Sequence, residues 1–196
     1  MTGIILAGGR GRRISAEKPL IEIGGKKVIS RIIDIFSGLF EEIIVVTNSP
    51  EKYEGLGVII AGDVILGKGP MVGIYSGLLV SSHQYNFVVG GDMPFIKAEF
   101  VEYIMSIERD GFDVIVPEKN GYYEPLHAIY SKSCMHNMRK LIKEGKLKIQ
   151  DLYKILKLKT VIEEITIKFD PHFTSFFNIN TKEDLMRAEK IATNFP

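Results

Sequence analysis

The chain has 196 residues, of which 45% are hydrophobic and 25% charged, a composition typical of one globular domain with a substantial core. Its 25 basic and 24 acidic side chains give a formal net charge of +1, which excludes nucleic-acid binding through overall charge. The one cysteine, Cys134, excludes an internal disulfide, and no apolar run has the length of a membrane span. The apolar stretch at the N-terminus lacks the charged leader of a signal peptide. We therefore expect a cytoplasmic protein that binds neither nucleic acid nor a membrane.

Short apolar runs alternate with helical patterns along most of the chain. The first run predicts a strand at 3–6, and apolar residues at helical spacing predict a helix at 28–40. Further apolar runs predict strands at 43–47, 58–60, 87–89 and 114–117. Further helical patterns predict helices at 70–80, 98–107 and 134–144. Because most of these strands are apolar without alternation, both faces of the sheet should be covered. The order predicts an α/β, three-layer Rossmann-like fold around a mostly parallel sheet.

The order of elements changes after residue 120. Strands are predicted at 122–130, 161–167 and 174–179, and we expect them to form a small extension over one end of the sheet. The last helix is predicted at 182–192, with Thr181 as its N-cap and Asp184 three residues on. No repeat or linker interrupts the chain. We therefore expect one domain over 1–196, with a first part at 1–117 and an extension at 118–196.

The most informative segment, residues 6–18, follows the first predicted strand and combines glycines with cations. The glycines allow a close approach of the backbone to a ligand, and they are Gly8, Gly9 and Gly11. The cations are Arg10, Arg12, Arg13 and Lys18. Taken alone, the segment is compatible with a polyphosphate site and equally with a solvated basic turn.

Two common phosphate-binding loops are excluded for this part of the chain. In a Walker loop, Leu20 would have to be glycine and Lys27 would have to be Ser or Thr. In a Rossmann fingerprint, Ile14 would have to be glycine. The glycine-rich segment is therefore of another type.

Polar residues follow several other predicted strands, at the edge where open α/β sheets bind ligands. Asp92 is a candidate ligand for Mg²⁺, which takes one or two carboxylates and completes its shell with water and phosphate oxygens. A turn or helix cap is the alternative for Asp92. Pro70 suits the first turn of a helix, so Gly69 stands where unpaired N–H groups would face the crevice. We expect Gly77, on the same helix, to serve tight packing.

The remaining candidates have turn or capping chemistry as their alternative. Asn178 and Asn180 stand two apart and would project to the same side of an extended segment. Asn48 ends the strand at 43–47, and Asp63 follows the strand at 58–60. Glu124 and His127 place a charged residue and a histidine near the extension.

Together these segments resemble the molybdenum cofactor guanylyltransferase family, also called molybdopterin-guanine dinucleotide biosynthesis protein A. That family carries L-A-G-G-x-S-x-R-M-G-x-D-K near the N-terminus, then G-P-L-A-G, D-M-P-F and N-x-N-T-x-E-D-L. Nearly the whole chain matches in this order, at Leu6, Ala7, Gly8, Gly9, Arg13 and Lys18, then at 69–73, 92–95 and 178–185. Four positions of the first motif depart from the family: Gly11, Ile14, Ser15 and Glu17. Ser15 narrows the conformations of the loop where the family has glycine.

The resemblance implies a nucleotide-diphospho-sugar transferase fold that transfers GMP from GTP to the phosphate of molybdopterin and releases pyrophosphate. Residues 1–117 would bind the nucleotide and 118–196 would face the acceptor. The acceptor phosphate is already an anion at neutral pH, so no general base is needed. Proteins that insert or deliver the molybdenum cofactor are implied as partners.

The resemblance also implies a role for each site residue. The triphosphate of GTP would meet the backbone of Leu6, Ala7, Gly8 and Gly9 and the side chains of Arg13 and Lys18. The catalytic residues would be Arg13, Lys18 and Asp92, with Asp92 holding Mg²⁺. The guanine nucleotide would meet Asn48, Asp63 and Gly69, with Asp63 accepting from the base or from the ribose. The pterin would meet Asn178 and Asn180, with His127 as a weaker candidate.

Two other functions fit parts of the pattern. One is a related enzyme, either a cytidylyltransferase acting on the same cofactor or a sugar-nucleotide pyrophosphorylase. The segment 69–73 favours the guanylyl enzyme. The other is a nucleotide-binding regulatory protein without turnover, against which the joint presence of Arg13, Lys18 and Asp92 argues.

Overall fold

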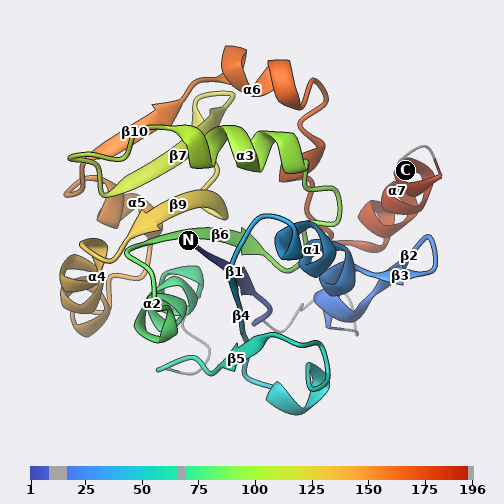
Figure 1. Ribbon diagram of the computed structural model, residues 1–196, viewed down its shortest axis with the longest axis horizontal. Helices are drawn as coiled ribbons and strands as arrows, with labels where there is room; N and C mark the ends of the chain where they lie inside the picture. The colour runs from blue at the N-terminus through green and yellow to red at the C-terminus, as the bar shows by residue number, and fades with distance from the viewer. Residues whose placement is uncertain (9–16, 66–68, 194–196) are drawn as a thin grey trace.

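The computed structural model describes residues 1–8, 17–65 and 69–193. Its main sheet is crossed by strands in the order β10 (Leu158–Val161), β7 (Val114–Lys119), β9 (His127–Ser131), β6 (Tyr85–Gly90), β1 (Thr2–Leu6), β4 (Glu42–Val46) and β5 (Ile59–Ala61) (Figure 1). β9 is antiparallel to both of its neighbours, and the other neighbouring pairs in this order are parallel. The short strand β8 (Tyr122–Tyr123) pairs with β7 as a hairpin. The carboxyl ends of β1, β4, β5, β6 and β7 therefore share one edge of the sheet.

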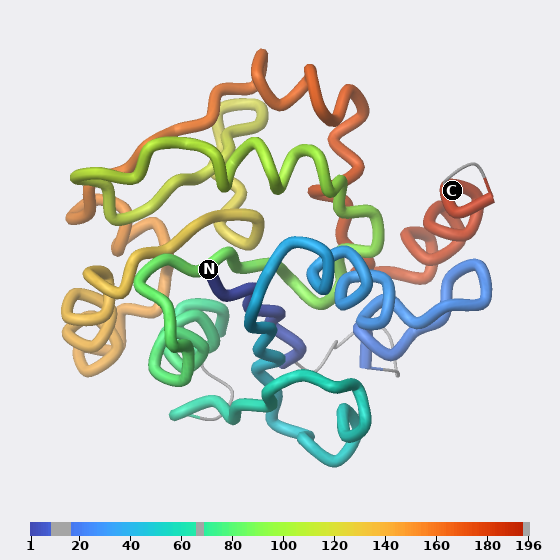
Figure 2. Tube along the Cα trace, in the orientation of Figure 1, coloured from blue at the N-terminus to red at the C-terminus, as the bar shows by residue number. Residues whose placement is uncertain are grey.

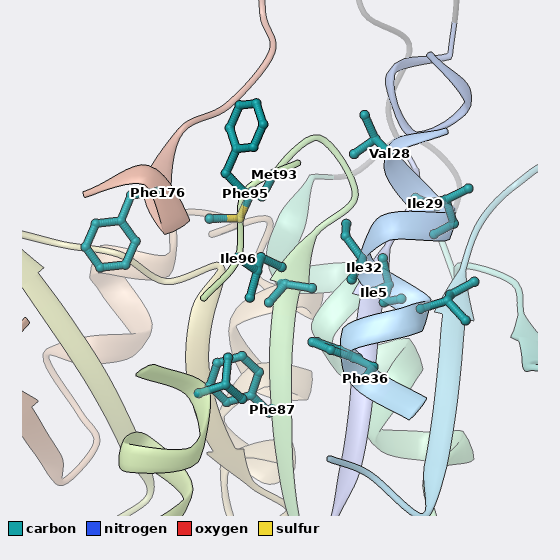
Figure 3. Packing of buried hydrophobic residues seen from close by; sticks show 14 of the residues in the cluster. Ile5, Val28, Ile29, Ile32, Phe36, Phe87, Met93, Phe95, Ile96 and Phe176 are labelled. Atoms are coloured by element: carbon teal, nitrogen blue, oxygen red, sulfur yellow. The ribbon is translucent and has the colours of Figure 1, made fainter. Parts of the chain in front are cut away.

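Helices cover both faces of this sheet, which gives the expected three layers. One face carries α1 (Val28–Ser37), α3 (Ala98–Ser106), α6 (Glu163–Phe169) and α7 (Lys182–Ala192). The other face carries α2 (Pro70–Val80), α4 (Cys134–Lys143) and α5 (Ile149–Tyr153). Alternate strand residues enter opposite cores, as Ile4 and Ile5 do, because successive side chains of a strand point to opposite faces. Figure 3 shows the first core, where Ile5 and Phe87 of the sheet meet Phe36 of α1.

The glycine Gly77 of α2 faces the sheet directly. A Cβ atom at this position would lie 2.7 Å from Cγ2 of Ile4 and 3.3 Å from Cγ2 of Val46. The packing role predicted for Gly77 is therefore confirmed. The close approach of α2 brings the N-terminus of this helix against the end of β1.

The predicted strands at 3–6, 43–47, 58–60, 87–89 and 114–117 correspond to β1, β4, β5, β6 and β7, with ends that differ by one or two residues. The five predicted helices correspond to α1, α2, α3, α4 and α7. Thr181 caps α7 as expected, since its side chain accepts from Asp184 N while the Asp184 carboxylate accepts from Thr181 N.

Three strands predicted in the C-terminal part differ from the structure, and the segments 122–130 and 161–167 are two of them. The segment 122–130 is not one strand: β8 and β9 are separated at Pro125, which has no N–H to donate to a ladder. β9 moreover lies inside the sheet, between β6 and β7, and does not extend over its end. The segment 161–167 begins as the end of β10 and continues as α6, where Glu163 and Glu164 occupy the first turn that favours acidic residues.

The segment 174–179 also differs from the predicted strand. It begins with a 3-10 turn, η3 (Thr174–Phe176), and pairs with no strand of the described chain. The carboxylate of Asp170 accepts from Thr174 N at 3.0 Å and from Ser175 N at 2.7 Å. Local bonds of this kind compete with sheet pairing, which explains the turn.

Smaller elements were not predicted, namely η1 (Lys18–Leu20), β2 (Glu22–Ile23), β3 (Lys26–Lys27), η2 (Pro50–Lys52) and α5. β2 and β3 form a hairpin that lies beside α7, at the right of Figure 2. Gly24 N donates to Oε2 of Glu189 at 3.1 Å. The C-terminal helix is thereby held against the segment that follows the first loop. Within the described residues, no helix has the length and apolarity needed to cross a membrane.

Candidate active site

Backbone hydrogen bonds just beyond the strand ends bring the ends of four strands together. Ala7 N donates to Val46 O at 2.8 Å, Thr47 N to Ala61 O at 2.9 Å and Gly91 N to Leu6 O at 2.9 Å. These bonds extend the parallel pairing of β1, β4, β5 and β6 by one residue each. The polar residues that follow these strands therefore lie along one edge, as predicted for an α/β sheet that binds a ligand there.

Lys18, Asp92 and Asn180 form a polar cluster on this edge. Nζ of Lys18 lies 2.9 Å from Oδ2 of Asp92 and 2.6 Å from Oδ1 of Asn180. The side chains of Lys18 and Asp92 are 17% and 22% exposed, so a ligand can reach both. Ile179 N donates to Asp92 O at 3.0 Å, which fixes the segment that carries Asn180. The cluster therefore joins residues from the first loop, the end of β6 and the approach to α7.

Gly91, which precedes Asp92, allows the end of β6 to lie close to the end of β1 and to η1. A Cβ atom at Gly91 would lie 2.9 Å from Leu6 O and 2.9 Å from Cγ of Pro19. Only a residue without a side chain allows β6 to run this close to the end of β1 and to η1. Sequence reasoning assigned no role to Gly91, although a pair of glycines directly before an acidic residue was a usable signal.

Asn48 and Asp63 form a second polar pair, on the β4–β5 side of the same edge. Nδ2 of Asn48 donates to Oδ2 of Asp63 at 2.9 Å. Oδ1 of Asp63 is buried and has no hydrogen-bond partner among the described residues. Burial raises the pKa of Asp63, and the hydrogen bond from Asn48 opposes that rise. A ligand that donates hydrogen bonds to Oδ1 would remove this unfavourable burial.

Glycine backbone surrounds Asp63 on two sides. A Cβ atom at Gly8 would lie 3.6 Å from Oδ2 of Asp63, and one at Gly73 would lie 3.6 Å from Oδ1. Gly69 precedes α2 with a φ of 90°, a conformation that favours glycine, and Pro70 occupies the first turn. Gly8 and the N-terminal part of α2 therefore lie on two sides of Asp63. Unpaired N–H groups at a helix N-terminus favour an anion nearby.

Asp92, which follows β6, would suit a magnesium ion that is shared with a phosphate ligand. Within the described part of the chain, no three His, Cys, Asp or Glu side chains are arranged to hold a metal. Mg²⁺ in nucleotide sites needs only one or two carboxylates, since phosphate oxygens and water complete its shell. Asp92 is such a carboxylate, partly exposed and beside the cation Lys18.

The structure brings most of the predicted site residues to one edge. These are Leu6, Ala7, Gly8, Lys18, Asn48, Asp63, Gly69, Asp92 and Asn180. Gly9 and Arg13 lie outside the described residues. Asn178 differs from Asn180, because its Nδ2 donates to Phe176 O at 2.9 Å and makes no bond to the Lys18 cluster. The side chains of the two asparagines therefore have different hydrogen-bond partners.

His127 lies in the core and not at the site. It has no exposed surface, and its ring stacks on Phe100 at 5.3 Å between centroids. Phe87 and Phe176 contact it edge-on. Neither ring nitrogen has a hydrogen-bond partner among the described residues. Burial lowers the pKa of His127 to about 3, and the predicted contact of His127 with a ligand is wrong.

Because His127 is buried, we expect the folded protein to lose stability in acid. The unfolded chain protonates this side chain near its ordinary pKa of about 6.5, whereas the folded protein does so only near 3. The folded state therefore loses stability as the pH falls from about 6.5 to about 3, by roughly a few kcal/mol. His127→Phe should reduce this loss, as measured by urea unfolding at pH 7 and pH 5, and should leave turnover unchanged. His136→Gln, at an exposed position, should unfold as the wild type does.

Comparisons with known proteins agree with this arrangement. Residues 3–161 match the family model described as the MobA-like NTP transferase domain. The chain is 37% identical to a probable molybdenum cofactor guanylyltransferase of Natranaerobius thermophilus, over 97% of this chain and 95% of that protein. It is 36% identical to a molybdenum cofactor guanylyltransferase of Desulfosudis oleivorans, over 96% and 94%.

A solved structure of a related protein has the same fold as this chain. The crystal structure of molybdopterin-guanine dinucleotide biosynthesis protein A from Archaeoglobus fulgidus superposes with a TM-score of 0.87. The match covers 100% of both chains at 33% sequence identity. This chain therefore shares its arrangement of layers with that protein, from the first strand to the last helix.

Proposed function

Because the chain belongs to the MobA-like NTP transferase family, we propose that it transfers GMP from GTP to the terminal phosphate of molybdopterin. An oxygen of the acceptor phosphate forms a bond to the α-phosphorus of GTP. The bond from the α-phosphorus to the oxygen that bridges the α- and β-phosphates breaks, and pyrophosphate leaves. Relatives that are 36–37% identical carry the name molybdenum cofactor guanylyltransferase, which supports this choice of substrates. Proteins that receive or deliver the finished cofactor are the partners we expect.

The cluster of Lys18 and Asp92 is the observation that carries this proposal. The attacking and leaving groups are both anionic, so the protein must neutralise and align phosphates. The ammonium group of Lys18 is a donor to a phosphate oxygen, and the partly exposed carboxylate of Asp92 is the ligand for Mg²⁺. The bound ion would neutralise charge on the triphosphate during transfer. Arg13 is proposed as a further cation from its position in the sequence motif.

We assign the guanine base to the pair Asn48–Asp63. Guanine presents its N1–H and its C2 amino group side by side, and a carboxylate accepts from both. Oδ1 of Asp63 lacks a donor among the described residues, and Asn48 occupies Oδ2 on one side. Hydrogen bonds from the base would therefore meet a group that is otherwise unsatisfied.

This assignment predicts the effect of Asp63→Asn on nucleotide choice. Inosine triphosphate lacks the C2 amino group, so the wild type should prefer GTP over it. The amide of the variant repels that amino group, and the preference should fall by about tenfold. The ratio of kcat/KM for the two nucleotides measures this. An unchanged ratio with weaker binding of both nucleotides would move Asp63 from the base to the ribose.

The proposed reaction is tested by pyrophosphate release from the purified protein with magnesium and molybdopterin. Release that depends on both GTP and molybdopterin is expected. Equal or faster release with CTP would favour a cytidylyltransferase. No release with either nucleotide, from a protein that binds GTP, would favour a regulatory role.

A further inference from the structure

The connection between β8 and β9 carries a carboxyl group that has no role in the reaction described above. Glu124 is half-buried, and its side chain makes no hydrogen bond to another described residue. Burial raises the pKa of Glu124, and the charge of Lys119 opposes that rise. A carboxylate in such a place costs free energy unless donors reach it. A ligand that donates hydrogen bonds to the carboxylate of Glu124 would offset this cost.

Glu124 lies on the same edge of the sheet as the Lys18 cluster. β9 runs antiparallel to β6, so β9 begins at the edge where β6 ends. Gly90 N donates to Leu126 O at 3.3 Å, two residues before Asp92 in the chain. Glu124 N donates to Pro117 O at 2.9 Å, which fixes the residue beside β7.

The position of Glu124 along this edge separates it from the nucleotide. Asn48 and Asp63 follow β4 and β5, on one side of β6, whereas Glu124 precedes β9, on the other side. Asp92 follows β6 and stands between the two. An acceptor whose phosphate attacks the nucleotide beside Asp92 would approach from the side that the nucleotide leaves open, which is the side of Glu124.

The other polar candidates on that side are already engaged. His127 is enclosed by Phe87, Phe100 and Phe176. Asn180 accepts from Lys18, and the amide of Asn178 donates to a backbone carbonyl. Glu124 differs because no described residue donates a hydrogen bond to its carboxylate.

We propose that Glu124 accepts hydrogen bonds from the pterin ring of the acceptor and so determines which acceptor is used. A pterin carries a C2 amino group next to a ring N3–H, and these adjacent donors match the two oxygens of a carboxylate. The positive charge of Lys119 favours the ionised carboxyl group that such a contact requires. This inference rests on the proposed function, because that function supplies a pterin as the second substrate.

The contact is tested with 6-hydroxymethylpterin and 6-hydroxymethyllumazine. The pterin carries an amino group at C2, and the lumazine carries a carbonyl oxygen there. Calorimetry with GTP and magnesium present should show tighter binding of the pterin to the wild type. Glu124→Gln should weaken pterin binding by about tenfold and remove the preference, because its amide opposes the amino group. Glu118→Gln removes the same charge from the neighbouring strand β7 and should leave the preference intact. Equal preference in the wild type and the Glu124 variant would overturn the proposal.

A kinetic measurement distinguishes the proposed contact between Glu124 and the pterin from the proposed transfer of GMP. Glu124→Gln should raise the KM for molybdopterin by about tenfold while the KM for GTP stays constant. Pyrophosphate release by the wild type, with an unchanged molybdopterin KM in the variant, would overturn the pterin contact and leave the reaction. Pterin binding that depends on Glu124, without any pyrophosphate release, would support the contact and contradict the reaction.

Discussion

Replacing Asp92 with asparagine is expected to lower molybdopterin-dependent pyrophosphate release by about a thousandfold or more. The variant loses the carboxylate proposed to hold Mg²⁺, a contribution of several kcal/mol to the transition state, and each ~1.4 kcal/mol changes the rate tenfold. The fold should survive, because the bond from Ile179 N uses the backbone carbonyl of Asp92 and asparagine keeps the side-chain volume. A steady-state assay over a range of magnesium concentrations, with a thermal melt of each protein, makes the measurement.

The matched control for this variant is Asp34→Asn. Asp34 is also paired with a lysine, Lys26, but both side chains are exposed and lie on α1 and the β2–β3 hairpin. Its loss should leave turnover within a few-fold of the wild type, since exposed pairs contribute little. If Asp92→Asn retained comparable turnover, Asp92 would not be the metal ligand.

Replacing Lys18 with methionine is expected to weaken GTP binding by about 10- to 100-fold. A hydrogen bond to a charged group contributes about 1.5–3 kcal/mol, and methionine keeps the aliphatic stem of the side chain without its charge. The same change leaves Asp92 and Asn180 without their common donor. Titration calorimetry with GTP gives the dissociation constant directly.

Lys26→Met serves as the control, because it removes one charge from an exposed position on the β2–β3 hairpin. GTP affinity should remain near that of the wild type in this control. A Lys18 variant with the same GTP affinity as the control would exclude the contact with the triphosphate.

The parts of the fold that the sequence predicted are those with strong local signals. The apolar runs at 3–6 and 87–89 form the centres of β1 and β6, and α7 begins with a side-chain cap that is visible in the sequence. The segment 161–167 carried apolar residues that fit either a strand or a helix. The strand β10 ends at Val161, and the two acidic residues that follow favour a helix because they lie in its first turn. The end of β10 could not be read from the sequence.

The residues that gather at this edge of the sheet were predictable from the sequence, but the contacts between their side chains were not. The glycines and the acidic residues mark the strand ends, and parallel strands bring such ends together. That Lys18 meets Asn180, at a separation of 162 positions, follows only from the packing of α7 against the hairpin. Whether the side chain of His127 points into the core or toward the site likewise depends on which face of β9 packs against Phe87 and Phe100.

The bond between Ile179 and Asp92 has a consequence for the order in which the molecule is made. Lys18 and Asp92 leave the ribosome long before residues 179 and 180, which lie beyond the matched family domain at 3–161. Domains tend to fold during synthesis from their N-terminal side. A nascent chain that has reached residue 161 carries the sheet and both charges of the ion pair, but Asn180 is still to be added. Transfer activity should therefore arise only after release of the last helix, and not gradually as the chain grows.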